Sequence, residues 1–415
     1  MVLTALGALT AVGLATLWPD YAKVAEVSER VAAHNHLPDG TTFERGHIVG
    51  APEDCTLPPN PAALADPASV EQRTTTACLF IQVELATGPD AGRIVDVLAQ
   101  GPMATSGLQE GDRVELVAFP EYQPQGAQVA SHEVVNNYGL SGIIRGWPLL
   151  VLAAVFVGVI VAVGRLRGAL ALAALGVSAG VLLAFMLPAL ITGRPGILVG
   201  IVGASAIMFV TLYFVHGLSY RTTSALVGTL GGVLIIAGVS ILAIHITRLS
   251  GVDEEGSILL TKVSGEIDFR ALLTCAIIVA SLGILNDVTI TQASSVWELR
   301  AAAPHLKRRD VYASAMRIGR DHIASTVYTV FFAYTGAALS VLMVMYLHNR
   351  PLQSLLTIDT LAIEIVHTLC GGIGLVLAVP ITTAVAALFI PAATAEASTP
   401  AKTMHHGNEK VGDRN

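Results

Sequence analysis

The feature that most constrains this chain is its series of long apolar runs, because an α-helix needs about 20 apolar residues to cross a bilayer. Hydrophobic residues make up 53% of the 415 residues and charged residues only 13%, where soluble globular domains carry about 25% charged residues. This composition excludes a soluble enzyme, a nucleic-acid-binding protein and a disordered scaffold. Eight runs are candidate transmembrane helices, namely 2–18, 147–164, 169–191, 196–216, 223–247, 270–292, 323–347 and 361–390.

Lys and Arg in short loops predict the orientation, because cytoplasmic loops of membrane proteins are enriched in them. The connection 165–167 and the loop 300–320 are basic, whereas the loop 253–268 is acidic. Both termini are therefore predicted to be cytoplasmic. The predicted parts are an N-terminal membrane anchor over 1–18, an extracytoplasmic domain over 19–146, a seven-helix membrane domain over 147–392 and a disordered cytoplasmic tail over 393–415.

The outer segment 19–146 is predicted to be a small β-rich domain, an antiparallel barrel or sandwich. Apolar and polar residues alternate over 78–85, 92–98 and 112–119, and turn signals separate these stretches. The region from Pro38 to Pro67 is expected to be a loop. A PDZ-like domain is the alternative, because Gly-Leu-Gln-Glu-Gly-Asp over 107–112 resembles a turn of those domains.

Cys55 and Cys78 are the two cysteines of this outer segment, and the other two, Cys275 and Cys370, lie in apolar runs. An extracytoplasmic location favours a disulfide between Cys55 and Cys78. Two free thiols are the alternative.

Motifs for catalysis, metal binding or nucleotide binding are not found in the sequence. Gly-Val-Ser-Ala-Gly over 176–180 matches a hydrolase pattern, but that pattern requires a strand–turn–helix context. Here it lies inside an apolar run, where small residues four apart are typical of close helix packing. We therefore predict that the chain is not an enzyme and holds no metal or cofactor.

Ionisable and hydroxyl side chains form stripes at helical spacing in the last three runs. Asp287, Thr291, Ser294 and Glu298 share one face of the sixth run. The seventh and eighth runs carry similar stripes, and we expect the three to face one another. Ionisable groups inside a membrane are costly and usually functional, so the candidate proton or ion relay is Asp287, Asn286, Thr291, His322, Thr329 and Glu364. Interhelical hydrogen bonding that only holds the bundle together is the alternative.

Four stretches resemble the YibE/F family of bacterial multi-pass membrane proteins. They are Ile-Leu-Asn-Asp-Val-Thr-Ile-Thr-Gln-Ala-Ser-Ser-Val-Trp-Glu-Leu (284–299), Ile-Gly-Arg-Asp-His-Ile-Ala-Ser-Thr-Val-Tyr-Thr (318–329), Ala-Tyr-Thr-Gly-Ala (333–337) and Glu-Ile-Val-His-Thr-Leu-Cys-Gly-Gly-Ile-Gly-Leu-Val-Leu-Ala-Val-Pro-Ile-Thr-Thr (364–383). The resemblance covers about 75–415 and implies a multi-pass protein of the bacterial inner membrane.

A remoter resemblance is to SecF and the permeases of the resistance–nodulation–division class. The Asn286–Asp287 pair, the basic loop after it and the Ser/Thr-rich stretch that begins at Asp321 carry this resemblance. It implies use of protons through intramembrane carboxylates.

We therefore predict an α-helical polytopic membrane protein with about eight spans, acting as a proton- or ion-coupled permease or export-assisting protein. The expected partners are the lipid bilayer, a proton or ion, and an envelope protein at the outer domain, with no nucleic acid. The alternative function is a non-transporting membrane scaffold whose outer domain binds an envelope partner.

Overall fold

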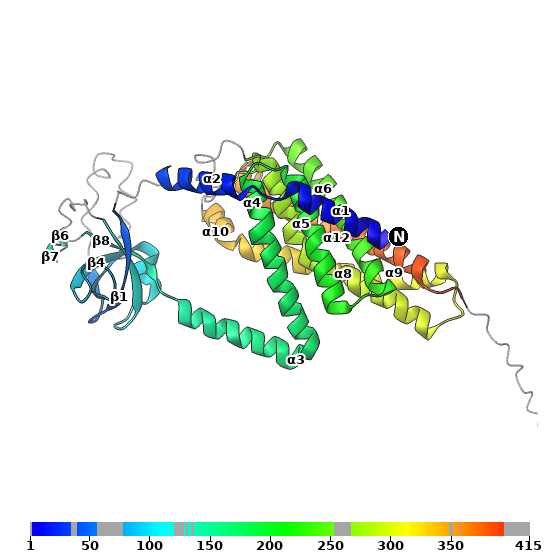
Figure 1. Ribbon diagram of the computed structural model, residues 1–415, viewed down its shortest axis with the longest axis horizontal. Helices are drawn as coiled ribbons and strands as arrows, with labels where there is room; N and C mark the ends of the chain where they lie inside the picture. The colour runs from blue at the N-terminus through cyan, green and yellow to red at the C-terminus, as the bar shows by residue number, and fades with distance from the viewer. Residues whose placement is uncertain are drawn as a thin grey trace, which may run out of the picture. The chain divides into compact units, whose positions relative to one another are not determined.

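The structure is a computed structural model that describes residues 2–34, 40–55, 78–119, 128–129, 132–133, 137–252, 267–347, 352–355 and 357–393. The predicted tail over 393–415 and the acidic part of the 253–268 loop lie almost wholly outside these residues. Two compact units form, a helical unit of Met1–Arg30 with Gly164–Asn415 and a β-domain within Val31–Val163. Both units can be followed in Figure 1.

The β-domain is one curled antiparallel sheet with strand order β2-β3-β1-β5-β8, and β4 pairs with β3 on its other side. Its edge strands β4 and β8 come into contact with each other. This curling favours the barrel alternative over the PDZ-like one. The elements are β1 (Thr42–Ile48), β2 (Glu53–Cys55), β3 (Cys78–Leu85), β4 (Ile94–Gln100), the 3-10 helix η3 (Gly101–Ser106), β5 (Arg113–Ala118), the short hairpin β6 (Gln128–Val129) with β7 (His132–Glu133), and β8 (Tyr138–Ile143).

Alternation along the strands builds the core of this domain. In β3 the inward positions include Ile81, Val83 and Leu85, all at most 2% exposed, and β4 and β5 add further aliphatic residues. The prediction of a loop between Pro38 and Pro67 is wrong in part, because β1 and β2 lie in this region. The inward positions of β1 include Glu44 and Gly46, so its sequence lacks an apolar alternation that would reveal a strand.

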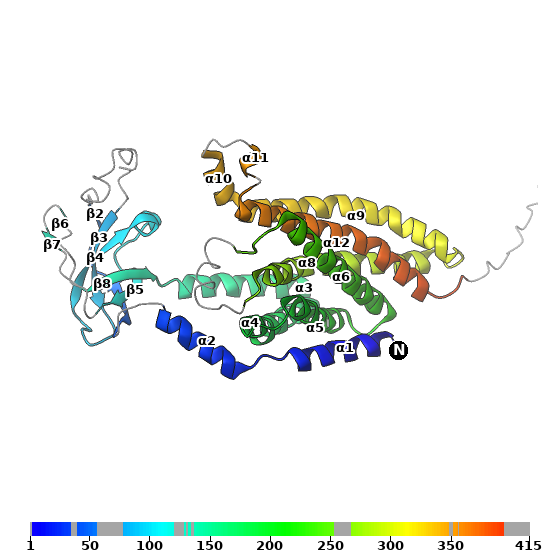
Figure 2. The ribbon, with the colours of Figure 1, turned by 90° about the horizontal axis from the view of Figure 1, so that it is seen from above.

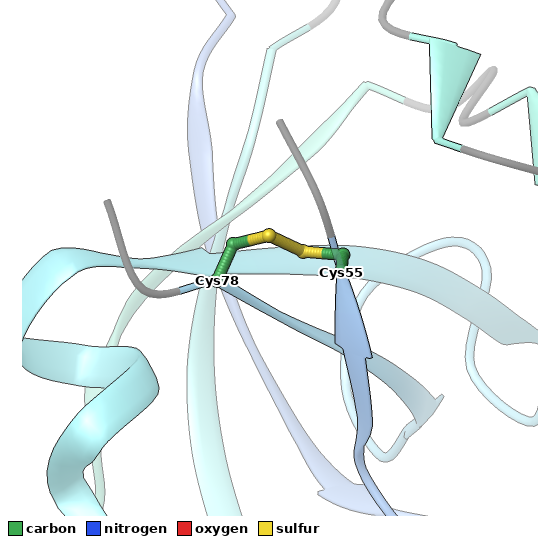
Figure 3. The surroundings of a disulfide bond; sticks show 2 residues. All are labelled: Cys55 and Cys78. Atoms are coloured by element: carbon green, nitrogen blue, oxygen red, sulfur yellow. A yellow bond between two sulfur atoms is a disulfide. The ribbon is translucent and has the colours of Figure 1, made fainter. Parts of the chain in front are cut away.

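The predicted disulfide is confirmed, because Cys55 and Cys78 are bonded (Figure 3). Both residues lie directly opposite each other in the antiparallel ladder of β2 and β3, with Cα atoms 5.3 Å apart. This separation is within the usual range for disulfides. The bridge therefore closes the chain segment between two paired strands.

The helical unit contains five helices that pack closely, α5, α6, α8, α9 and α12, with α1 against α5. Figures 1 and 2 show α5, α6, α8 and α12 side by side. The helices of the chain are α1 (Val2–Leu17), α2 (Tyr21–His34), α3 (Gly146–Val181), the π-helix η4 (Leu182–Met186), α4 (Leu187–Ile191), α5 (Gly196–His216), α6 (Tyr220–Thr247), α8 (Phe269–Ala302), α9 (Arg308–Ala337), α10 (Leu339–Leu347), α11 (Leu352–Leu355) and α12 (Asp359–Phe389).

Capping residues set the start of two central helices. The Ser219 side chain accepts the Thr222 N–H at the start of α6, and the Asp268 side chain accepts the N–H groups of Arg270 and Ala271 at the start of α8. These bonds satisfy helix N–H groups that lack an intrahelical acceptor.

Five helices of the described chain are long and apolar enough to cross a membrane, and the eight predicted spans map onto them unevenly. The runs 147–164 and 169–191 fall in one continuous stretch in which only Arg165 leaves the helical region, with φ 50°. The basic connection between them is therefore a kink, not a loop. The run 323–347 is divided at Ala338 between α9 and α10, and α1 has only 16 residues. The five are Gly146–Ile191, Gly196–His216, Tyr220–Thr247, Phe269–Ala302 and Asp359–Phe389.

The start of α2 belongs to the helical unit, although the predicted outer domain began at residue 19. Pro188 has no N–H and so cannot donate to the carbonyl of Ala184, four residues earlier. The Tyr21 hydroxyl donates to that carbonyl instead, and the Lys23 ammonium donates to the Thr192 carbonyl at 3.4 Å. These two bonds hold the beginning of α2 against η4 and against the residue that follows α4.

Candidate functional site

A buried amide ties three helices together at the centre of the helical unit. Gln292 of α8 is 2% exposed, and its Nε2 donates to the Ala315 carbonyl of α9 at 3.0 Å and to the Thr383 hydroxyl of α12 at 2.8 Å. An amide left unpaired in this position would lose the hydrogen bonds that water provides. Gln292 therefore fixes how α8, α9 and α12 align.

A second buried contact lies one turn away and joins α6 to α8. The hydroxyls of Thr229 and Thr289 are 2.6 Å apart, and both side chains are fully buried. The Thr229 hydroxyl also bonds to the Ala225 carbonyl of its own helix. The hydroxyls are therefore paired without water.

Glycines let these helices approach closely around the two contacts. A Cβ atom on Gly228 would lie within 1.9 Å of the Thr382 hydroxyl, and one on Gly319 would lie 3.0 Å from the Gln292 side chain. Pro380 interrupts α12 at the same place. Because proline has no N–H, the Val376 carbonyl loses its helical partner. Close contact, buried polar groups and an interrupted helix thus coincide where α6, α8, α9 and α12 meet.

The predicted stripe on α8 lies on the opposite side from this junction. Asp287, Thr291 and Glu298 are exposed in the structure. The expectation that the stripes of all three helices face one another is therefore wrong for α8. Polar residues lie on both faces of α8, with Thr289 and Gln292 opposite Asp287, so the sequence alone does not indicate which face packs against neighbouring helices.

Asp287 and His322 nevertheless lie at the same level of the antiparallel pair α8 and α9. The Gln292–Ala315 bond and the cavity shared by Ser281 and Val330 define the register of the two helices. This register places Asp287 level with about residue 322, since helical residues rise about 1.5 Å each. His322 is half-buried, and its Nε2 is buried without a hydrogen-bond partner among the described residues.

The remaining candidate residues are dispersed. Asn286 is half-buried, and its Oδ1 finds no hydrogen-bond partner in the described part of the chain. Thr329 is exposed, and its hydroxyl donates to the Ser325 carbonyl. Glu364 is half-buried near the start of α12. The parallel register of α8 and α12, set by Gln292 and Thr383, separates Glu364 from Asp287 by roughly 20 Å along the axis.

An open groove follows the exposed stripe of α8. It has a volume of about 390 Å³ and is lined by Thr291, Ser294, Ser295 and Glu298, with Ile318 of α9. Hydroxyl and carboxylate groups therefore lie along one uncovered surface of a candidate span. Such a surface is costly against lipid, which favours water, an ion or another helix as its neighbour.

Nearer the start of α12 lie two further groups, His367 and Tyr334, that are not among the predicted site residues. The Nε2 of His367 is buried without a hydrogen-bond partner in the described structure, and its ring contacts the Tyr334 ring with centroids 5.7 Å apart. A cavity of about 10 Å³, lined by Ser281, Tyr334 and Gly371, lies next to it. That volume is close to the size needed for one water molecule.

Gln292, Thr289 and Thr383 were also missed in the sequence analysis, although they lie inside stretches that carry the family resemblance. Ser281, Thr289, Gln292 and Ala293 are the small and polar residues of the packed face of α8, and such residues mark helix interfaces in membranes. The polar stripe on the opposite face gives a similar signal, so the sequence alone does not separate the two faces.

The junction offers hydrogen-bonding groups, and the exposed side of α8 carries carboxylates, but the described residues contain no cluster of metal ligands. Among the residues that the structure describes, no group of three His, Cys, Asp or Glu side chains could hold a metal ion. The chemistry that this arrangement supports is the transfer of protons or the binding of a small ion between carboxylate, imidazole, hydroxyl and water.

A comparison with protein-family models finds a match to the model described as YibE/F-like protein, over residues 152–392. This region contains the whole polar junction. Comparisons with curated proteins and with solved structures find no match.

Proposed function

The chain belongs to the YibE/F-like protein family, and on this premise we propose that it is a proton- or ion-coupled permease, or a protein that assists export. The proposal places it in a bacterial inner membrane, with both termini in the cytoplasm and residues 19–146 outside. The outer location is supported by the Cys55–Cys78 disulfide, because such bonds persist in oxidising compartments.

The proposed topology has eight spans, with the two halves of Gly146–Ile191 crossing separately on either side of the Arg165 kink and with α9 and α10 together forming one span. Single cysteines at Ala302 and Ser257 test it in a chain that lacks Cys275 and Cys370 but keeps the disulfide. A membrane-impermeant thiol reagent should label Ser257→Cys in intact cells and Ala302→Cys only after lysis. Labelling of both positions in intact cells contradicts this topology.

The observation that carries the proposed activity is that Asp287, a carboxylate in a candidate span, lies at the same level as His322 of the neighbouring helix. The imidazole Nε2 of His322 is buried and has no hydrogen-bond partner among the described residues. A carboxylate and an imidazole can each take up and release a proton. Asn286 next to Asp287 adds an amide oxygen that lacks a partner within the described chain. Side chains of this kind inside a membrane are usually functional.

Proton movement in proteoliposomes tests the role of Asp287. The purified protein is reconstituted with a pH-sensitive dye inside the vesicles, and a potassium gradient with valinomycin supplies the membrane potential. Wild-type vesicles should acidify faster than empty ones, and Asp287→Asn should lower this rate to that of empty vesicles, because Asn has a similar shape but cannot carry the proton. Thr329→Val should lower the rate less.

Glu298→Gln is the matched control, because Glu298 is exposed on the same stripe near the end of α8. This variant should keep most of the proton flux. Full activity of Asp287→Asn, or equal losses in the two variants, would contradict the proposal.

The alternative of a non-transporting scaffold is favoured by a different observation. Many buried hydroxyls, such as those of Thr382 and Thr383, bond to carbonyls of their own helix, as expected for side chains that only support packing. Under this alternative an envelope protein binds the outer domain. The Asp287→Asn protein then keeps its cellular function. Vesicles with the wild-type protein and vesicles with the variant both show the proton flux of empty vesicles.

A further inference from the structure

One mouth of the curled sheet in the β-domain is a cavity whose walls come from four separate elements. It has a volume of about 350 Å³, within the usual range of about 300–1,000 Å³ for small-molecule sites. The start of β1, the turn between β3 and β4, the end of β5 and the start of β8 line it. The polar and aromatic side chains in its wall are Thr42, Asp90, Arg93, Phe119, Asn137 and Tyr138.

Hydrogen bonds hold this mouth in one shape. The Tyr138 hydroxyl donates to Asp90 Oδ2 at 2.9 Å, and the Phe119 N–H donates to the Asn137 carbonyl at 2.7 Å. Beneath the turn, the Glu44 carboxylate is 6% exposed and accepts the hydroxyls of Thr42 and Thr87 at 2.9 and 2.8 Å. A preformed cavity loses little conformational entropy when a ligand binds.

Two carboxylates of the domain act on the Tyr138 hydroxyl in the mouth. Burial, the hydrogen bond to Asp90 and the charges of Asp90 and Glu44 raise the pKa of Tyr138 to about 12, and Arg93 opposes them only weakly. The Arg93 and Asp90 side chains lie 3.8 Å apart and are 66% and 43% exposed, so solvent weakens this ion pair and a ligand can reach the Asp90 carboxylate. Over the outer segment 19–146 as a whole, Asp and Glu outnumber Lys and Arg by more than two to one, which attracts cations over a longer range.

The lining also suits the apolar part of such a ligand. The aromatic side chains of Phe119 and Tyr138 share the cavity with Val95 and Ala118. Aromatic faces attract ammonium groups through their negative quadrupole. Metal binding is disfavoured, because Glu44 is already bonded to two hydroxyls and the described chain has no cluster of three metal-ligating side chains.

We propose that this mouth binds a small organic cation, with an alkylammonium group at Asp90 and its carbon chain against Phe119 and Tyr138. The site belongs to the β-domain alone and does not depend on the proposed transport activity. It would allow the outer domain to sense or capture an amine.

Calorimetric titration of the full-length protein in neutral detergent tests the proposal with two matched probes. Cadaverine carries an ammonium group at each end of a five-carbon chain, and pentanediol carries hydroxyls on the same chain. Cadaverine should bind, more weakly at higher ionic strength, and pentanediol should not. Asp90→Asn should raise the Kd for cadaverine about tenfold or more, because a charge-assisted contact is lost.

Asp96→Asn is the control, because it removes the same charge from the same domain at a site on β4 where Asp96 accepts a bond from Gln82. Its Kd should stay within about twofold of the wild-type value, since only the long-range charge changes. Tyr138→Phe keeps the ring but frees Asp90, and should weaken binding less than Asp90→Asn. An intact disulfide and an unchanged melting temperature show that each variant is folded.

Three results would overturn the proposal. Equal cadaverine affinity in the Asp90 and Asp96 variants would mean unspecific attraction to an acidic domain. Binding of pentanediol as tight as that of cadaverine would mean a site for hydroxyl ligands such as sugars. No detectable binding of cadaverine to the folded wild-type protein would mean that the mouth is only a structural closure of the sheet.

Discussion

The β-domain and the helical unit differ in how they bury polar side chains. Within the described residues, Glu44 is the one buried charged or polar side chain of the β-domain. Hydrogen bonds from two threonine hydroxyls offset the free-energy cost of burying its carboxylate. The helical unit buries many more, mainly hydroxyls. The buried hydroxyl and amide residues of α6, α8, α9 and α12 are Thr222, Ser224, Thr229, Ser240, Thr274, Ser281, Thr289, Gln292, Thr326, Thr382 and Thr383.

This difference follows from where each fold satisfies its backbone. A helix satisfies its own backbone groups, and a Ser or Thr hydroxyl can bond to the carbonyl four residues earlier, as Ser281 does to Ile277. Small hydroxyls can therefore be buried between helices at little cost. A strand has no such local acceptor, so its inward positions are aliphatic. Buried hydroxyls are thus frequent inside the helical unit, whereas the inside of the β-domain is almost wholly aliphatic.

Removal of the disulfide should have the largest effect and should be confined to the β-domain. Replacement of Cys55 and Cys78 by Ser should destabilise this domain by about 3 kcal/mol, because the closed loop restricts its unfolded chain. Hydrogen exchange measured by mass spectrometry should become faster in β3 and stay unchanged in α8. Reduced wild-type protein is the control and should behave like the double variant. Faster exchange in both units would show that they unfold together.

Gly228→Ala should destabilise the helical unit by about 1–3 kcal/mol, because the added methyl group collides with Thr382 of α12. Gly238→Ala on the same helix α6 is the control, since a Cβ there meets no atom within 4 Å. Thermal unfolding in detergent measures both. Equal shifts in the two variants would mean that close helix approach does not hold this unit together.

Tyr21→Phe should destabilise the contact between α2 and η4 by about 1 kcal/mol, because the Ala184 carbonyl loses the Tyr21 hydroxyl as a donor. In a Pro188→Ala background the same change should cost less, since the restored N–H can bond to that carbonyl. Thermal unfolding of the four proteins of this double-mutant cycle measures the difference. A cost that is the same in both backgrounds would refute the explanation through proline.

The smallest expected effect is a pH dependence of the β-domain. The pKa of Tyr138 is raised to about 12 in the folded domain, above about 10 for an unfolded tyrosine. Its contribution to stability is therefore complete below about pH 10 and is lost as the pH rises through about 12. Hydrogen exchange of β8, measured in short pulses between these pH values, should become faster as this stability is lost. In Tyr138→Phe the pH dependence of the exchange rate should disappear. An identical pH profile in wild type and variant would contradict this assignment.

Sequence patterns located strands and helices well where the signal was local. The stretch 78–85 was predicted as a strand and is β3, and the apolar run 196–216 is α5. The strand β1 could not be found, because its inward positions include a carboxylate and a glycine instead of aliphatic residues. Glu44 bonds to Thr87 in the turn after β3, and Gly46 packs against Val83 of β3, which no pattern within β1 reveals. The kink at Arg165 was predicted as a loop between two spans, because a basic pair in an apolar sequence looks the same in both cases.

Within the candidate site, the sequence indicated the helices but not their faces. Asp287 and His322 were selected together, and the register of α8 and α9 does place them at one level. The relay itself stays a prediction. Gln292 was overlooked, because its two acceptors lie 23 and 91 residues away in the chain, and no periodicity within α8 reports on them.

The sequence by itself determined that this chain has apolar helices long enough to cross a membrane, where most of them lie and which two cysteines share the polar segment. Hydropathy and strand alternation are properties of neighbouring residues, so a sequence reveals them directly. Only the tertiary structure decided that Gln292 and not Asp287 faces the other helices, and that Asp90, Phe119 and Tyr138 share one cavity. Both outcomes depend on contacts between distant segments. The rotation of an apolar helix and the closure of a sheet are set by how those segments pack, which no local pattern encodes.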